Sequence, residues 1–530
     1  MLVIVRNLKI MFGSIKIKKE NSLNRKNFKL YILFLIISTG IFLRIYNLGR
    51  QSIWLDEARA FFRANKSVHE LWSNQIKESN PPLYDILLHY FLRFINKKDE
   101  FHIRFFSAIM GILLIPLSFI AGRSLFGQRV GLFSSLLVAI SPYHIYYSQD
   151  TKMYTFLSFL SLASFFIYYL ALERDKVMYW CSYALITILL IYCHNYGFLL
   201  FLTQIIIFVI FYKKYPENLA KFLLINQIIF IFSIPRINCI SQQILLDYNP
   251  WIRSPSARDV VNTFTYFSLL SWHLQLTPSV IIAFIIGLPI YLFLFGMAIL
   301  VKNGDKYSNL KRFSISDKII FIKLYLFIPL LLAMLFSLKK PIFVSGRYDM
   351  VVFPAFCLLI SFALNRIKKD VWRTFLIRCI VIATSVCLYN YYFIFEKSND
   401  RTLAHYLQTK TDRDTILVFT GLSLQPTLYY CEKSFLPNTV SFPEFNLGWL
   451  PRAAIEAEKG YVNNEIKKLK NKIKPFMEKN YSLWVIYINL EMNQLLIEEL
   501  KKDYRFSEVI NFTPGRNDSQ VNEIYIFRNL

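Results

Sequence analysis

Long apolar segments recur along most of this chain, and they constrain its fold more than any other feature. Residues 30–46, 130–147 and 281–301 are each long enough, or nearly so, to cross a hydrocarbon core about 30 Å thick. Hydrophobic residues fill 55% of the 530 positions, which leaves too little polar surface for a soluble protein of this length. The sequence therefore predicts a polytopic α-helical membrane protein.

The number of spans follows from the basic residues in the gaps between apolar runs. Membrane proteins keep such short basic gaps in the cytoplasm. All of these gaps fall on one side if about eleven segments span the membrane, with the basic N-terminus, 1–29, in the cytoplasm. The predicted spans are 30–46, 105–121, 130–147, 154–172, 178–193, 196–212, 222–234, 281–301, 319–337, 350–364 and 374–395.

One apolar segment, 83–95, is too short to be a span. Asp85, His89 and Arg93 recur in it at every fourth position and so share one face of a helix. We expect an amphipathic helix that lies along the membrane surface. The transmembrane domain is then 30–395, and its larger external loops are 47–104, 148–153, 236–275 and 338–349.

The last part of the chain, 396–530, differs from the rest. Segments 415–420, 482–489 and 523–527 have the pattern of strands, and 453–480 and 492–502 that of helices. This alternation predicts a small α/β domain, which the odd number of spans places outside the cytoplasm.

The charge and the cysteines narrow the function further. A net charge of +26 is typical of some nucleic-acid-binding proteins. Here the basic residues lie in short gaps between spans, so no nucleic-acid partner is expected. We expect a multi-pass protein of the cell (inner or plasma) membrane, in contact with membrane lipids. Cys239 and Cys431 fall in predicted external segments, but nothing in the sequence supports a disulfide between them.

Acidic residues stand at two of the predicted external turns. Asp56 and Glu57 follow the first span, beside Trp54, and Asp150 precedes Lys152 at a later turn. His194 lies at the next external turn. Taken alone, each of these motifs fits a solvated turn with aromatic anchors.

Three basic residues in the predicted external loop 338–349 depart from the rule that basic residues stay on the cytoplasmic side. Lys339, Lys340 and Arg347 are predicted to lie outside, and an anionic ligand at that face explains the exception. Acids and cations then converge on one membrane face. This arrangement suits a reaction in which a carboxylate removes a proton while cations hold a phosphate leaving group.

The same residues carry a family resemblance. Arg44, followed by Ser-Ile-Trp-Leu-Asp-Glu-Ala ending at Ala58, resembles the first-loop motif of the GT-C glycosyltransferases. The nearest branch contains protein O-mannosyltransferases, lipid A aminoarabinose transferases and related bacterial core-sugar transferases. Four further elements match in order within 30–365: Asn80-Pro-Pro-Leu-Tyr, Arg104-x-x-Ser, Ser-Gln-Asp150-x-Lys152-x-Tyr154 and Arg347-Tyr348. The branch usually has His where Asn80 stands.

The resemblance implies a polyprenyl-phosphate-linked monosaccharide donor, a glycan, lipid or protein acceptor, and transfer with inversion. Asp56 would be the base, and Glu57 would position Asp56 or the acceptor. The remaining expected donor- or substrate-binding residues are Asn80, Arg104, Asp150, Lys152, Tyr154, His194, Arg347 and Tyr348. No cofactor is predicted; some relatives use a divalent metal, and none is carried over here.

Two other functions remain open. A polysaccharide polymerase or ligase that acts on lipid-diphosphate glycans would also be polytopic, but it is not expected to have an Asp-Glu pair directly after span one. A transporter of a lipid-linked sugar tends to show inverted repeats and ionisable residues at mid-membrane. This chain shows no repeat, and its charged motifs lie at the ends of spans.

Overall fold

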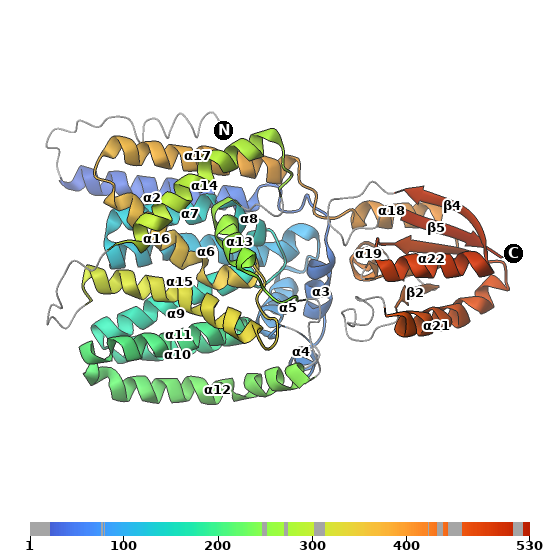
Figure 1. The fold of residues 1–530 in the computed structure, drawn as a ribbon, viewed down its shortest axis with the longest axis horizontal. Helices are drawn as coiled ribbons and strands as arrows, with labels where there is room; N and C mark the ends of the chain where they lie inside the picture. The colour runs from blue at the N-terminus through green and yellow to red at the C-terminus, as the bar shows by residue number, and fades with distance from the viewer. Residues whose placement is uncertain are drawn as a thin grey trace.

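The computed structural model describes residues 22–75, 78, 80–245, 252–269, 274–301, 313–421, 423–431, 438–443, 458–511 and 523–529. Figure 1 shows two parts, a large helical body and a smaller C-terminal domain with a β-sheet. In the described part of the chain, all helices of the body precede the first strand.

All eleven predicted spans lie in helices of the body. Nine helical segments are long and apolar enough to cross a membrane, a bent pair makes a tenth, and Val177–Cys193 is apolar but shorter, within the described ranges. The helices are α2 Ser22–Ile45, α6 Glu100–Phe126, α7 Gln128–Ile140, α8 Pro142–Ser148, α9 Tyr154–Arg174, α10 Val177–Cys193, α11 Tyr196–Phe211, α12 Leu219–Leu245, α14 Pro278–Ile299, α15 Ile315–Ser337, α16 Phe353–Arg366 and α17 Asp370–Phe393, with short 3-10 turns η2 Tyr212–Lys214, η3 Pro216–Asn218 and η4 Tyr348–Val352.

The predicted continuous span 130–147 is wrong in one respect, because it is broken between α7 and α8. The two helices meet at 58°. Pro142 cannot donate a backbone hydrogen bond and disfavours a helical conformation in the preceding residue, Ser141. The Ser141 side chain instead accepts a hydrogen bond from the backbone N–H of His144 and starts a new helix.

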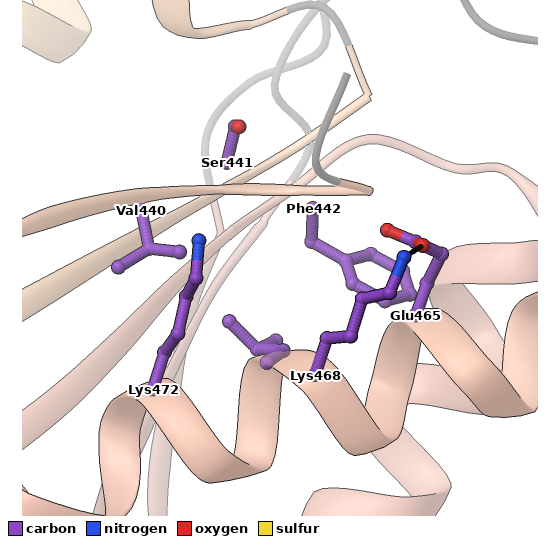
Figure 2. Close-up of a pocket in the computed structure, with 7 residues that line it drawn as sticks. Val440, Ser441, Phe442, Glu465, Lys468 and Lys472 are labelled. Carbon is purple, nitrogen blue, oxygen red and sulfur yellow. Dashed lines mark hydrogen bonds and ion pairs between the residues drawn. The ribbon is translucent and has the colours of Figure 1, made fainter. Parts of the chain in front are cut away.

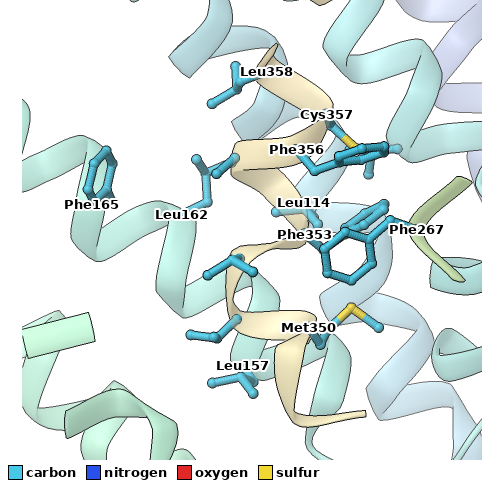
Figure 3. Packing of buried hydrophobic residues seen from close by; sticks show 14 of the residues in the cluster. Leu114, Leu157, Leu162, Phe165, Phe267, Met350, Phe353, Phe356, Cys357 and Leu358 are labelled. Atoms are coloured by element: carbon cyan, nitrogen blue, oxygen red, sulfur yellow. The ribbon is translucent and has the colours of Figure 1, made fainter. Parts of the chain in front are cut away.

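Helix α16 is the centre of the body. Every side chain from Phe353 to Leu364 is buried. Figure 3 shows α9 and neighbouring helices packed around it, with Leu157 on one side and Phe267 on the other. The Phe267 ring lies 5.5 Å from the rings of both Phe353 and Phe356. This packing fixes the residues just before α16, which include Arg347.

Among the described residues of the helical body, four helices lie outside the predicted spans: α3 Leu55–Ala64, α4 Val68–Ser73, α5 Leu83–Ile95 and α13 Ala257–Leu269. Helix α5 has the predicted bounds, and part of its polar face is turned toward the helical body. Asp85 and His89 are buried against α3, where Asp85 pairs with Arg63 at 2.5 Å and His89 donates to the Ala64 carbonyl at 2.8 Å. The apolar side chain of Phe94 is 90% exposed instead. The ion pair with Arg63 provides the physical reason for turning this face inward.

The C-terminal domain contains a five-stranded sheet in the order β2-β1-β3-β5-β4. Its strands are β1 Thr415–Thr420, β2 Thr439–Phe442, β3 Ser482–Tyr487, β4 Arg505–Asn511 and β5 Glu523–Arg528. Strands β2, β1 and β3 are parallel, and β5 is antiparallel to both β3 and β4. The helices are α18 Asp400–Lys410, α19 Leu424–Tyr430, α21 Lys459–Met477 and α22 Glu491–Asp503.

Side chains along β1 alternate between the two faces of this sheet, and each face packs into its own hydrophobic core. Ile416 and Val418 pack with α21 and α22, whereas Leu417 and Phe419 pack on the α18 side. The sequence predicted β1, β3, β5, α21 and α22, but it missed α18, α19, β2 and β4. The helix predicted at 453–480 begins at Lys459 in the described residues. All seven cysteines are free, so Cys239 and Cys431 are not bonded.

Candidate active site

Asp56 lies at the end of the helical body that faces the C-terminal domain. It belongs to the first turn of α3, which lies between the helical body and the C-terminal domain (Figure 1). Its Oδ1 is 3.7 Å from Lys152 Nζ, and its Oδ2 is 3.5 Å from Arg347 Nη1. The Asp56 side chain is 19% exposed, so solvent reaches it. Three predicted site residues from distant parts of the chain therefore meet.

The two cations control the ionisation of Asp56. Burial acts to raise its pKa, but the charges of Lys152 and Arg347 outweigh burial and hold the pKa below its usual value. Asp56 is therefore a carboxylate at neutral pH. A further cation at this point would be repelled by both neighbours. Among the described residues, no three His, Cys, Asp or Glu side chains gather as a metal site would require.

Glu57 has a different environment from its neighbour. Its side chain is fully buried, and Arg104 donates to both of its oxygens, each at 2.7 Å. The backbone N–H of Thr151 donates to the same carboxylate at 3.1 Å. Burial acts to raise the pKa of Glu57, but Arg104 and then Lys397 lower it more strongly. Glu57 thus joins α3 to α6 and to the turn before α9.

Asp150 is also buried, and it contacts a residue that the sequence analysis did not identify. Its Oδ1 accepts hydrogen bonds from Trp54 Nε1 at 2.8 Å and from Lys397 Nζ at 2.9 Å. Burial raises the pKa of Asp150 despite this lysine. Lys397 follows the last span in a segment with no recognisable motif, so only the folded chain reveals its position.

Hydrogen bonds to the Asp349 carboxylate fix the turn that carries Arg347. Gly346 has φ +74, a conformation that favours glycine, and its N–H donates to Asp349 at 2.8 Å. Thr263 of α13 donates to the same Asp349 oxygen at 2.6 Å. The Arg347 guanidinium lies over the Trp54 ring, 5.5 Å from its centroid. Asp349 is a second residue that the sequence analysis missed, although it directly follows the Arg-Tyr pair.

Aromatic residues form one wall next to this turn. The His194 ring lies 4.7 Å from that of Tyr348 and 6.5 Å from that of Tyr154. Burial, and then the charge of Arg236, lower the pKa of His194 to about 3, so this ring is neutral. His194 Nδ1 accepts a hydrogen bond from the backbone N–H of Tyr196 at 3.1 Å. These contacts give His194 a place in the wall and no charge.

Two residues of the motifs that carry the family resemblance lie outside the contacts around Asp56. Arg44 is buried and donates to the carbonyls of Val138 and Ala139 at 2.8 and 3.0 Å, which joins α2 to α7. Asn80 is half-buried shortly before α5, and no described contact joins it to Asp56. The structure brings the other predicted site residues to one end of the body.

Two hollows elsewhere differ in chemistry from the Asp56 site. Figure 2 shows one in the C-terminal domain, between β2 and α21, where Lys468 pairs with Glu465 at 2.6 Å. Its volume of about 10 Å³ has room for roughly one water molecule. The other, of about 350 Å³, lies among α2, α7 and α17, and no ionisable side chain other than tyrosine lines it. Neither offers a carboxylate beside free space for a sugar.

Comparison with known proteins agrees with this geometry. Residues 79–237 match the family model described as dolichyl-phosphate-mannose-protein mannosyltransferase. An uncharacterised protein of Aquifex aeolicus (strain VF5) is 23% identical over 161 residues, which cover 28% of this chain and 31% of that relative. This match thus spans less than a third of the relative's length.

Solved structures with the same fold cover nearly the whole chain. ArnT from Cupriavidus metallidurans in the apo state has a TM-score of 0.57 at 12% identity, over 93% of this chain and 97% of ArnT. ArnT bound to undecaprenyl phosphate gives 0.56 over the same shares. The apo oligosaccharyltransferase of Archaeoglobus fulgidus gives 0.50 at 12% identity, over 95% of this chain and 76% of that one.

The predicted fold class, a polytopic helical body with a small C-terminal α/β region, is therefore confirmed. The family match lies within the body, and the solved structures share the arrangement of body and C-terminal domain. Residues 79–237 thus resemble that mannosyltransferase family, and the whole chain has the fold seen in ArnT.

Proposed function

We propose that this protein transfers a monosaccharide, a hexose or a pentose, from a polyprenyl-phosphate donor to an acceptor hydroxyl at the external membrane face. The observation that carries the proposal is the partly exposed position of Asp56 between Lys152 and Arg347. ArnT, which shares the fold, has been solved with undecaprenyl phosphate bound. The acceptor is a glycan, a lipid or a protein, and the protein resides in the cell membrane.

The reaction needs one base and a stabilised leaving group. Asp56 takes the proton of the acceptor hydroxyl while that oxygen attacks the anomeric carbon. The bond from this carbon to the phosphate oxygen breaks, the polyprenyl phosphate leaves, and the configuration inverts. Lys152 and Arg347 stabilise the negative charge that develops on the phosphate. A phosphate leaves without being protonated, so no second acid is required, in contrast to ordinary glycoside hydrolysis.

Donor binding also makes Asp56 a better base. In the ligand-free site two cations lower its pKa, which weakens it as a proton acceptor. A donor phosphate placed between Lys152 and Arg347 offsets their charge. Asp56 then regains basicity when the donor is present, which links proton removal to a filled site.

The other residues support this arrangement. Glu57 positions Asp56 through the bidentate bond with Arg104, which fixes the start of α3. Tyr154, His194 and Tyr348 provide the aromatic wall of the donor site. Asp150 orients Trp54, whose ring lies against Arg347, and Asn80, just before α5, binds the donor or the acceptor. The charged groups lie at the end of the helical body, whereas a transporter would have them near mid-membrane.

The direct test is substrate consumption by the purified protein. It is incubated with labelled polyprenyl-phosphate hexoses and pentoses, each matched by the polyprenyl-diphosphate form of the same sugar. We expect loss of one monophosphate donor and release of polyprenyl phosphate. Consumption of diphosphate donors alone would instead support a polymerase or ligase, and consumption of none would contradict the proposal.

A further inference from the structure

Lys397 connects the C-terminal domain to the buried acids of the site. It lies in the segment between α17 and α18, and its side chain is 2% exposed. Its Nζ is 2.9 Å from Asp150 Oδ1 and 3.3 Å from Glu57 Oε2. The same ammonium lies 5.9 Å from the centroid of the Trp54 ring. Lysine is rarely fully buried unless it is paired, so this buried contact with two carboxylates indicates a specific role for Lys397.

The charges in this buried group balance. Glu57 and Asp150 contribute two carboxylates, and Arg104 and Lys397 contribute two cations. Removing one cation leaves a buried carboxylate without compensation, which is strongly unfavourable. Lys397 therefore stabilises the charged forms of both acids in their observed positions.

The backbone around Lys397 binds the loop that leads to Asp56. Lys397 N–H donates to Gln51 Oε1 at 3.0 Å, and Gln51 Nε2 donates to the Phe395 carbonyl at 2.8 Å. From the C-terminal domain, the Tyr430 hydroxyl accepts from the Ile53 N–H at 2.7 Å. Gln51 and Ile53 are thus held by segments more than 300 positions later in the chain.

A chain of contacts leads from Lys397 to the proposed base. Lys397 and Trp54 Nε1 both donate to Asp150 Oδ1. The Trp54 ring supports the Arg347 guanidinium, which contacts Asp56. A displacement of Lys397 would therefore move Trp54 and, through it, the cation next to Asp56.

We propose that Lys397 is a positioning residue through which the segment leading into the C-terminal domain fixes the geometry of the active site. The inference rests on the proposed transferase function. It assigns this domain a part in the site itself, because its attachment supplies the cation that holds the Asp150–Trp54–Arg347 arrangement. Lys397 touches neither donor nor acceptor in this account.

The test is a charge-compensating pair of substitutions in the full-length protein. Lys397→Met should lower kcat by about 10²-fold, the usual effect of a displacement near 1 Å at a reacting centre, with little change in donor KM. Adding Asp150→Asn restores charge balance with Arg104 and Glu57. We expect the double variant to recover at least about tenfold of the lost kcat, which simple loss of packing would not produce. Lys410→Met, at an exposed lysine of α18, is the matched control and should behave as the wild type.

Each outcome has a distinct meaning. Wild-type kcat in Lys397→Met, or a double variant no more active than Lys397→Met, overturns the inference but leaves the transferase function intact. If Lys397→Met does not accumulate in the membrane, the double variant should both accumulate and turn over, and its absence also overturns the inference. A wild-type protein that consumes no donor refutes the proposed function instead.

Discussion

At the scale of single residues, the proposed chemistry depends on the different environments of two adjacent acids. Asp56 is partly exposed between two cations from distant loops, whereas Glu57 is buried in a bidentate pair with Arg104. Consecutive residues of a helix point about 100° apart, so they face different surroundings. The family resemblance implied that Asp56 is the base and that Glu57 positions Asp56 or the acceptor. The choice of Asp56 as the base remains a prediction.

The pKa of Asp56 leads to a prediction for the pH dependence of the rate. The lowered pKa belongs to the free enzyme, whose groups are reported by kcat/KM for the donor, while kcat reports the donor complex. A bound phosphate offsets Lys152 and Arg347 and raises the pKa of Asp56. Activity should therefore be lost at a higher pH in the kcat profile than in the kcat/KM profile as the solution is acidified. Coincident profiles, or the reverse order, would count against Asp56 as the titrating base.

The same scale shows what sequence motifs cannot reveal. Asp56, Lys152 and Arg347 belong to motifs at predicted turns, and their convergence was expected because those turns share a membrane face. Lys397 and Asp349 have comparable contacts but stand in no pattern that the sequence analysis recognised. Their roles depend on distances between segments hundreds of residues apart, which periodicity and charge do not encode.

At the scale of elements, helix periodicity and turn chemistry determine most of the body. The spans were predictable because a helix buried in lipid must be apolar over its whole length. The break between α7 and α8 depends on Ser141 and Pro142, a local signal inside an otherwise continuous apolar run. For helix α5 the sequence predicted the bounds correctly. The direction of its polar face could not be predicted, because it depends on the ion pair between Asp85 and Arg63 of another helix.

The Glu57–Arg104 pair provides a test of how α3 is joined to α6. Arg104→Met leaves Glu57 buried without its bidentate partner, which should destabilise the protein by about 3–5 kcal/mol. We expect a clear fall in the midpoint of thermal unfolding in detergent. Arg123→Met is the matched control, because Arg123 is exposed at the other end of α6. An equal change in both variants would show that the buried pair contributes nothing specific.

At the scale of the whole molecule, the loops at one end of the helical bundle and the C-terminal domain form one unit. Arg401 of α18 pairs with Glu100 of α6 at 2.6 Å, and α19 contacts α3. The sequence predicted an α/β tail outside the membrane, but it gave no indication of this docking. Strands β2 and β4 were missed because β2 has four residues and β4 is largely exposed, so neither has the apolar signal of a buried strand.

This arrangement predicts the membrane topology. A reporter fused after the last residue should be active only outside the cytoplasm, and one fused at the N-terminus only inside. The physical reason is that the short basic gaps between spans remain cytoplasmic. A C-terminal reporter active in the cytoplasm would place the Asp56 site on the wrong side for an external acceptor.

The central claim is that Asp56 removes the acceptor proton, and Asp56→Asn tests it most directly. The amide keeps the size of the side chain but cannot accept the proton, so turnover of the donor should fall by about 10²- to 10⁴-fold. Donor binding should persist, because Lys152 and Arg347 remain and lose a competing negative charge. Glu498→Gln, at an exposed acid of the C-terminal domain, serves as the control and should leave turnover unchanged. Normal turnover in Asp56→Asn, measured with saturating donor and acceptor, would contradict the account.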